Sequence, residues 1–238
     1  IHCYYHGEVE GHQGSEVILS TCTGLRGMIS LENETYMLEP MQEGNSHHLY
    51  RGKHLKLMQG TCGHGHNISQ HTMMPWTERS SSHSSRRKRD IQSSIKYVEL
   101  IIVADNLSSS FQYQKQGKDV EKVKQRMAEI ANYVDKFYKS LNIRVALVGV
   151  EVWSDKDKCS ITQDPFSSLH EFLDWRKLKL LPLRAHDNAQ LISGVFFQGT
   201  TIGMAPIMSM CTAEQSGGIV MSRSPAHIVQ KADYTCLK

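Results

Sequence analysis

The sequence lacks the marks of several large classes of protein. No apolar run approaches the roughly 18 residues that a membrane-spanning helix needs. The net charge of +3 is small, and no Arg/Lys-rich helix or aromatic-interleaved basic face is present. A Gly-rich phosphate loop, a G-x-S-x-G turn and a C-x-x-C motif are also missing. Nucleic-acid binding, and chemistry built on these three motifs, are therefore not supported.

An initial Met and a signal peptide are missing as well. The chain begins with IHCYYHG, so we expect its natural N-terminus to lie further upstream. Its 238 residues, of which 39% are hydrophobic and 21% charged, are typical of one large globular domain or two small ones rather than of a disordered protein.

Cysteines and sequons favour the secretory pathway and the extracellular space. Cys3 and Cys22 flank a short segment of the kind that a disulfide closes in secreted proteins. N-glycosylation sequons begin at Asn33, Asn67 and Asn106. Because such tripeptides also arise by chance, they support secretion only in combination with the cysteines.

A Ser/His-rich stretch over residues 72–94 is poor in core-forming residues and contains a basic run. Arg86, Arg87, Lys88 and Arg89 are consecutive. A solvated linker or a nuclear-localisation-like run is one interpretation. We favour a site for a furin-type proprotein convertase, whose acidic cleft binds several cations at once. Cleavage after Arg89 would divide the chain into a pro-segment and a second domain.

The segments on either side of this linker have different patterns. Residues 1–71 alternate short β-like stretches with turns, which predicts a small, mostly β unit. From residue 95, IKYVELIIVAD is typical of a strand buried on both faces. Residues 119–142 follow as a one-sided amphipathic helix that Asp119 can cap, with apolar residues at Val120, Val123, Met127, Ile130, Val134, Phe137 and Leu141.

The remainder continues the alternation of strand and helix. We expect a buried strand over 143–153, a helix over 166–180, a strand over 188–197 and short strands at 201–206 and 217–221. Strand, helix and strand in this order indicate a parallel crossover. The second domain is therefore predicted to be α/β with about five strands.

Candidate catalytic residues are scarce. His170-Glu171 begins like the zinc-protease motif H-E-x-x-H, but Asp174 stands where the second His belongs. The surrounding apolar residues explain this stretch as a packing helix. Cys159 is expected to be a free or pairing-competent thiol.

The stretch QGTCGHGHN, residues 59–67, contains Cys62, His64 and His66. All are zinc-ligand types, yet they are more crowded than the ligand pairs of a structural site. Composition alone leaves a metal site, half of one, and a loop with incidental histidines as alternatives.

Long segments of the chain resemble one family. They are KYVELIIVADN, VKQRMAEIANYVDKFYKSLNIRVALVGVEVW, DPFSSLHEFLDWRKLKLLP, HDNAQLISGVFFQGTTIGMAPIMSMC and QSGGIVM. Together they resemble the metalloprotease domain of the ADAM family of metalloprotease-disintegrins, over nearly all of residues 1–221. The resemblance implies a metzincin-like, five-stranded twisted mixed sheet behind a mostly β prodomain. It also implies a zinc endopeptidase that cleaves extracellular or cell-surface proteins, in a full-length parent that is membrane-anchored or secreted.

The resemblance also assigns roles to particular residues. GTCG at 60–63 matches the family's cysteine switch, so Cys62 would donate a thiolate to zinc, while His64 and His66 become polar loop residues. Cys3 and Cys22 match a propeptide disulfide, and Cys211 matches a cysteine that pairs near the domain's C-terminus. Glu99 and Asp187 match two ligands of a calcium site that needs further oxygens. The substrate-binding edge strand, which pairs with substrate backbone, would comprise Thr201, Ile202, Gly203, Met204 and Ala205.

The sequence departs from the family after Met221. SRSPAHIVQKADYTCLK, residues 222–238, has one histidine, His227, and no Glu, and no H-E-x-x-H occurs in the chain. We therefore expect an inactive, truncated product of a zymogen, a divergent tail over 222–238, no bound zinc and an incomplete calcium site. Cys236 could pair with Cys211. Two alternatives remain: a non-catalytic module that regulates a full-length protease, and a zinc-binding domain built on Cys62, His64 and His66.

Overall fold

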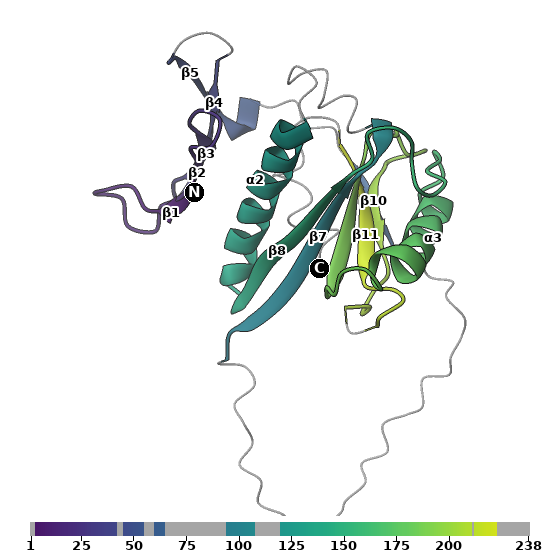
Figure 1. Cartoon of the computed structure of the whole chain (residues 1–238). Coiled ribbons are helices and arrows are strands. Elements are labelled where there is room, and N and C mark those ends of the chain that lie inside the picture. Colours follow the sequence, from purple (N-terminus) through teal and green to yellow (C-terminus); the bar gives the residue numbers. More distant parts are fainter. Residues whose placement is uncertain are drawn as a thin grey trace, which may run out of the picture.

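The computed structural model describes residues 3–41, 45–54, 60–64, 94–107, 120–210 and 212–222, without the side chains of residues 63 and 64. The described strands form two sheets, one of five strands and one of six. Figure 1 shows helix α2 between the two sheets and α3 on the far side of the larger one.

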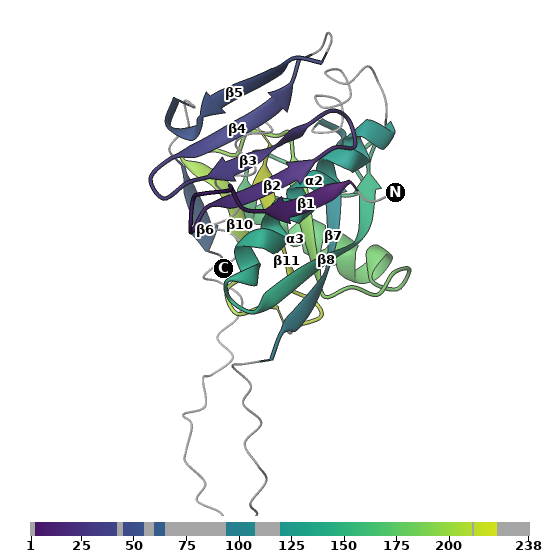
Figure 2. The same ribbon diagram turned by 90° about the vertical axis from the view of Figure 1, so that its left-hand side faces the viewer.

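The first sheet, called the N-terminal sheet below, is an antiparallel meander. Each strand pairs with the next one along the chain, in the order β1-β2-β3-β4-β5. A disulfide joins Cys3 to Cys22, with a Cα–Cα distance of 5.3 Å, and so ties the start of the sheet to the loop after β2. Figure 2 shows the five strands face-on in front of α2. Their bounds are β1 Tyr4–Gly7, β2 Glu16–Ser20, β3 Arg26–Ser30, β4 Thr35–Pro40 and β5 His47–Arg51, followed by a 3-10 turn at Gly52–His54.

The second sheet, called the mixed sheet, follows the order β6-β10-β11-β9-β7-β8. Its pairs are parallel except for β10 and β11, which are antiparallel. The strands are β6 Thr61–His64, β7 Lys96–Ala104, β8 Ile143–Val152, β9 Asn188–Ser193, β10 Thr201–Ala205 and β11 Gly217–Met221. The helices are α2 Val120–Lys139 and α3 Pro165–Trp175, which continues into a helical turn at Arg176–Leu180.

Strand β7 confirms the prediction of a strand buried on both faces. Leu100, Ile102 and Ala104 pack with the inner side chains of α2. Ile101 and Val103 alternate with them and pack with α3 on the opposite face. The alternation of side chains along one apolar strand therefore supplies both hydrophobic layers of the mixed sheet.

Three details of the predicted α/β domain are corrected. Segment 143–153 forms β8, but this strand lies at the edge of the sheet and is only partly buried. Helix α2 ends at Lys139, so Leu141 lies outside it and is 62% exposed. The domain supplies five strands as expected, and the sheet has a sixth because β6 joins it from the other side of the predicted linker.

Helix α2 is also not one-sided. Tyr133 lies in a buried cluster with Ile18, Met28 and Met37 of the N-terminal sheet, and Phe137 packs against this cluster. Phe137 was predicted to belong to the row that faces the larger sheet, but it lies on the other side of the helix. The apolar positions of α2 therefore serve two cores, one with each sheet.

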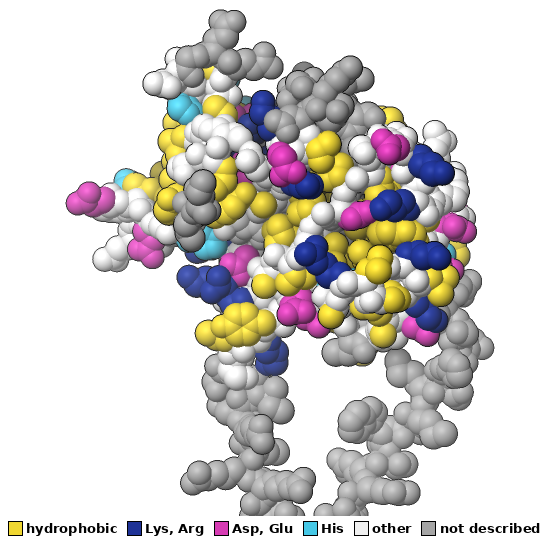
Figure 3. Space-filling model, viewed as in Figure 1, with side chains coloured by type: hydrophobic (Ala, Val, Ile, Leu, Met, Phe, Trp, Pro, Cys, Tyr) yellow, Lys and Arg dark blue, Asp and Glu magenta, His cyan; other side chains and the backbone are white. Residues whose placement is uncertain are grey.

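Among the described residues, no helix is both long and apolar enough to cross a membrane. Figure 3 shows Lys and Arg side chains interspersed with Asp and Glu over the described surface of one face. That face therefore carries both signs of charge, in agreement with the small net charge.

Candidate functional site

The predicted substrate-binding segment forms β10, and another segment of the chain already occupies its outer edge. On one side β10 pairs antiparallel with β11. On the other side it pairs parallel with β6, which sets Gly203 opposite Cys62 and Ala205 opposite His64. The backbone N–H of Thr61 donates to the carbonyl of Thr200 at 2.8 Å.

Close approach of the two backbones depends on Gly60. A Cβ atom at this position would lie 2.2 Å from Cγ2 of Ile202 and 2.9 Å from the carbonyl oxygen of Thr200. The register shifts between Thr201 and Gly203, so Ile202 has no partner in β6 and forms an irregularity of the bulge type. Any larger residue at position 60 would have to displace this part of β10.

Cys62 lies on β6, directly at the covered edge. It is partly buried and disulfide-bonded, and its partner lies outside the described residues. A zinc-binding cysteine must be a thiolate, so the structure holds Cys62 in a form that cannot bind zinc. The side chain of His64, and the whole of His66, also lie outside the described part of the chain.

The two predicted calcium ligands lie side by side. The backbone N–H of Glu99 donates to Oδ2 of Asp187 at 2.9 Å, and the N–H of Asp187 donates to the carbonyl of Glu99 at the same distance. One carboxylate oxygen of Asp187 thus accepts a backbone hydrogen bond. The described residues bring these two positions together, as the resemblance implied, and include no group of three or more His, Cys, Asp and Glu that could hold a metal ion.

Next to Asp187 is a buried pair that the sequence pattern did not identify. Nε of Arg176 donates to Nε2 of His186 at 2.9 Å, and its other nitrogens donate to the carbonyls of Ala213 and Asp187. Because Nε2 accepts a hydrogen bond, and Nδ1 lies 2.7 Å from the carbonyl of Arg184, His186 is neutral. Burial lowers its pKa. No periodic signal links residues 176 and 186, since the contact depends on how the turn after α3 folds back.

Two other candidate residues, His170 and Cys159, have surroundings typical of structural residues. Nδ1 of His170 lies 2.9 Å from the carbonyl of Phe166, one turn earlier in α3. Cys159 is a free thiol, in agreement with the expectation of a free or pairing-competent thiol. Burial, reinforced by nearby carboxylates such as Glu171, raises the pKa of Cys159 to about 12. A thiol with so high a pKa is a poor nucleophile at neutral pH.

The sequons differ in their surroundings. Asn33 lies exposed in the bend between β3 and β4. Asn106 follows β7, and its side-chain nitrogen donates to the carbonyls of Trp153 and Ser154 at 3.3 and 2.7 Å. The other predicted modification and processing positions lie outside the described residues: Asn67, Arg86, Arg87, Lys88, Arg89 and Cys211.

Comparison with known proteins gives the same family as the quoted segments. The model of the reprolysin (M12B) family of zinc metalloproteases matches residues 96–232, a range that contains β7–β11 and both helices and continues past Met221. This chain belongs to the reprolysin (M12B) family. Its mouse relative "Disintegrin and metalloproteinase domain-containing protein 12" is 64% identical over 94% of this chain and 24% of its own length.

Other relatives are more distant. Mouse "Disintegrin and metalloproteinase domain-containing protein 19" is 48% identical over 94% of this chain, and human "Disintegrin and metalloproteinase domain-containing protein 33" is 39% identical over 94%. The chain spans only 24–27% of the length of these relatives. The predicted resemblance to the metalloprotease domain of the ADAM family is therefore confirmed.

Zinc is the metal of this family. The described residues do not fit a zinc centre, because they contain no cluster of three metal-ligating side chains and Cys62 is disulfide-bonded. No catalytic step is therefore assigned through zinc.

Proposed function

We propose that the chain is the latent form of part of a secreted or membrane-anchored zinc metalloendopeptidase, in which residues 1–71 are a prodomain. The observation that carries this proposal is the pairing of β6 with β10. An extended peptide binds a sheet edge through the edge's free N–H and C=O groups. Strand β6 uses those groups, so a substrate can pair with β10 only after β6 leaves.

Removal of the prodomain would require a cut in the linker. We assign the cut to a proprotein convertase acting after Arg89, in the basic run Arg86–Arg89 of the predicted linker at 72–94. The substrates that could then pair with β10 would be extracellular or cell-surface proteins. Processing of the basic run and the disulfide between Cys3 and Cys22 both fit the secretory pathway.

Cys62 has a second role in this proposal. Its position beside Gly203 places it at the covered edge, where a thiolate could act as the family's cysteine switch if zinc were present. The disulfide at Cys62 excludes that state until it is reduced. Latency in the present form therefore depends on the strand pairing and not on a Cys62–zinc bond.

We also propose that these 238 residues do not hydrolyse peptides by themselves. They contain no H-E-x-x-H motif, and the segment after Met221 supplies only His227 as a further imidazole. Three protein ligands and an open position are needed for a catalytic zinc. The proposed cofactors of the family are thus zinc, not held by this chain, and calcium at Glu99 and Asp187 only if other oxygens complete the site.

Zinc content and peptide hydrolysis test the proposal together. The purified chain is dialysed against zinc, and its metal content and its action on a mixed quenched-fluorescent peptide library are measured before and after cleavage of the linker. We expect much less than one zinc per chain and no hydrolysis that a chelator abolishes. Stoichiometric zinc with chelator-sensitive hydrolysis would refute inactivity and would favour a zinc site that includes Cys62, His64 and His66.

A second candidate function is regulation in trans. The β6–β10 pair joins segments about 140 residues apart in sequence, so a β6-like segment of one molecule could cover the edge of another. In that case the chain should inhibit a full-length relative in a dose-dependent manner. Gly60→Ala should weaken the inhibition and Gly7→Ala should not, because a Cβ at Gly7 meets nothing within 4 Å. Equal inhibition by both variants would exclude this mode.

A further inference from the structure

The outer face of α2 contacts the N-terminal sheet through residues that take no part in the β6–β10 pairing. We propose that this face is a charge-selective recognition surface, which binds the N-terminal sheet through an alternating row of four charges and does so independently of β6. The two charges on α2 are buried and the two on the sheet are partly buried. The inference rests on the proposal that residues 1–71 are a prodomain. It adds a second attachment, and the residues that decide which sheet can bind there.

The centre of the contact is apolar. Ile18, Met28 and Met37 are at most 5% exposed, and they close over Tyr133 of α2. Tyr50 of β5 packs against the same cluster. Three buried aliphatic side chains are few for a sheet of five strands, so α2 completes the only buried cluster of the N-terminal sheet among the described residues.

Four charges lie beside this centre in alternating order. Oε2 of Glu129 accepts from Nη1 of Arg126 at 2.5 Å and lies 3.6 Å from Nε of Arg26. Nη1 of Arg26 lies 3.7 Å from Oε1 of Glu39. The row is thus Glu39, Arg26, Glu129 and Arg126, with the first two on the N-terminal sheet and the last two on α2. Arg126 is 4% exposed and Glu129 is 3% exposed, so neither reaches much solvent in this form.

Two tyrosines lie within the same cluster of charges. Burial raises the pKa of Tyr133 to about 12, with opposing influences from Arg126 and Glu129. Burial, together with Glu39, raises the pKa of Tyr50 to about 12. Both phenols therefore stay neutral at neutral pH, and the charge beside the apolar centre is carried by the four ionic side chains.

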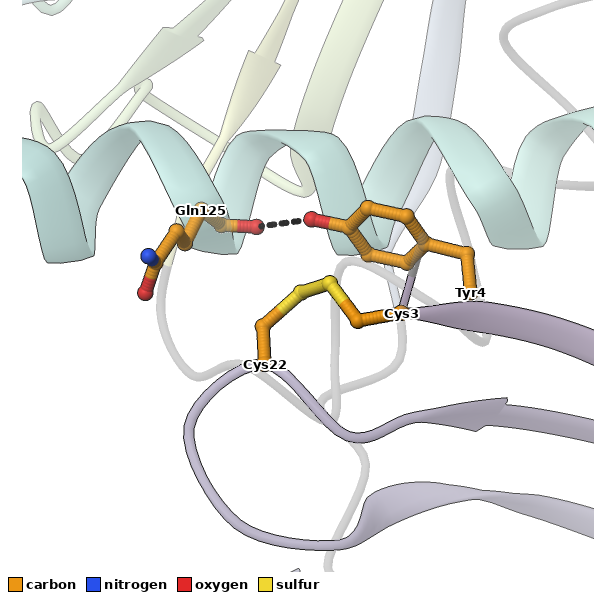
Figure 4. Close-up of a disulfide and its surroundings, with 4 residues drawn as sticks. All are labelled: Cys3, Tyr4, Cys22 and Gln125. Atoms are coloured by element: carbon orange, nitrogen blue, oxygen red, sulfur yellow. Dashed lines mark hydrogen bonds between the residues drawn. A yellow bond between two sulfur atoms is a disulfide. The ribbon is translucent and has the colours of Figure 1, made fainter. Parts of the chain in front are cut away.

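The rim of the contact is polar and positions the sheet. Nε2 of His6 lies 2.9 Å from Oδ1 of Asn132, and Nζ of Lys136 lies 2.9 Å from Oε1 of Glu16. Figure 4 shows the hydroxyl of Tyr4 directed at the backbone carbonyl of Gln125, next to the disulfide of Cys3 and Cys22. The disulfide ties the start of the first strand to the loop after β2, so Tyr4 lies on a cross-linked part of the sheet.

Selection follows from the cost of burying charge. A buried ion pair contributes little net stability, because desolvation offsets the attraction, whereas removing one partner leaves an uncompensated buried charge. Arg26 lies between the carboxylates of Glu39 and Glu129. A sheet with the same apolar centre but without Arg26 would bring Glu39 towards the buried Arg126–Glu129 pair with no cation between the two carboxylates. The row therefore discriminates strongly between sheets while adding little to affinity, as expected for a recognition surface.

The test uses the full chain in a Cys62→Ser background, in which no disulfide of Cys62 can join the two parts. A site-specific protease sequence replaces residues 84–89, and the cut is made after folding. The complex with a labelled N-terminal fragment is then mixed with excess unlabelled fragment, and loss of label from the complex is followed by size-exclusion chromatography. This gives the dissociation rate, at a urea concentration chosen so that the parental rate can be measured. Variants are Arg26→Met, Glu129→Gln and the two combined, with Lys136→Met as the peripheral control.

We expect the parental fragments to co-elute after the cut, although Cys62→Ser leaves no disulfide of Cys62 to join them. Arg26→Met and Glu129→Gln should each speed dissociation about tenfold or more, and the double variant should be no faster than the faster single variant by more than about twofold. Lys136→Met should change the rate by less than about threefold, because Glu16 is half exposed. A variant that reverses all four charges keeps the alternating order and should recover slow dissociation.

Immediate separation of the parental fragments would overturn the proposal. So would single variants that leave the rate unchanged, or single effects that simply add in the double variant. If the single variants fold poorly, the four-charge reversal decides: recovery of slow dissociation supports charge selection, and no recovery refutes it. Because neither zinc nor convertase processing enters the experiment, it can succeed or fail independently of the proposed function.

Discussion

The two sheets of this chain are stabilised in different ways. Every strand of the N-terminal sheet pairs with its neighbour in sequence, and the sheet buries its few apolar side chains against α2. The mixed sheet pairs strands out of sequence order and is packed on both faces, with separate clusters around α2 and α3. The N-terminal sheet therefore depends on α2 for its core. The mixed sheet depends on the N-terminal part only for cover of β10 and of the outer face of α2.

The largest effect is expected in the core of the mixed sheet. Phe172 is fully buried between α3 and the sheet, so Phe172→Ala should lower the free energy of unfolding by about 3–5 kcal/mol. Because the N-terminal sheet needs α2 in place, both sheets should unfold together in urea, followed by circular dichroism. Phe166→Ala, in the same helix but at a residue that is 38% exposed, is the control and should cost much less. Two separate unfolding transitions, of which Phe172→Ala shifts only one, would contradict this dependence.

A cavity in the N-terminal sheet should have a smaller and more local effect. Met37 is 3% exposed in the cluster shared with α2, and Met37→Ala should cost about 2–3 kcal/mol, the lower part of the range for Met→Ala. Hydrogen exchange should quicken in β2–β5 and leave α3 unchanged. Met41→Ala, at a residue that is 42% exposed, should leave exchange as in the parent. Faster exchange in α3 would show that the mixed sheet also depends on the N-terminal core.

Acid should weaken the mixed sheet through His186. Its pKa in the folded chain is lowered by burial, whereas the unfolded chain takes up a proton near the ordinary pKa of about 6.5. Below that pH the unfolded state binds more protons, so stability falls as pH falls towards the lowered folded pKa. His186→Gln keeps an acceptor for Arg176 but cannot take up a proton. Melting temperatures between about pH 7.5 and 5.5 should therefore fall less steeply in the variant than in the parent; equal slopes would rule out this origin.

Much of the mixed sheet could be predicted from the sequence because its signals are local. The continuous apolar run of β7 identified a strand buried on both faces, and the spacing of Val123, Met127, Ile130 and Val134 identified the inner face of α2. The same spacing included Phe137, which faces the other sheet. Periodicity identifies which residues are apolar and share a helix, but a helix between two sheets has two apolar sides and the pattern does not separate them.

The candidate site was less predictable. The segment at 201–205 was identified as an edge strand through resemblance, yet its pairing with β6 joins segments about 140 residues apart. TCGH is too short and too rich in polar residues to read as a strand, and it becomes one because β10 offers an open edge. Likewise, nothing local relates Arg26 to Glu129 or Arg176 to His186. These contacts depend on tertiary packing.

The covered edge of β10 is tested most directly by hydrogen exchange in Gly60→Ala, with Gly7→Ala as the matched control. A Cβ at residue 60 would collide with Ile202 and with the carbonyl of Thr200, whereas a Cβ at residue 7 meets nothing. We predict that amides of Thr201–Ala205 exchange markedly faster in Gly60→Ala, while those of β11 and of the N-terminal sheet keep the parental rates. Unchanged protection of β10 in Gly60→Ala, or protection already absent in the parent, would contradict the proposal that β6 masks the substrate-binding edge.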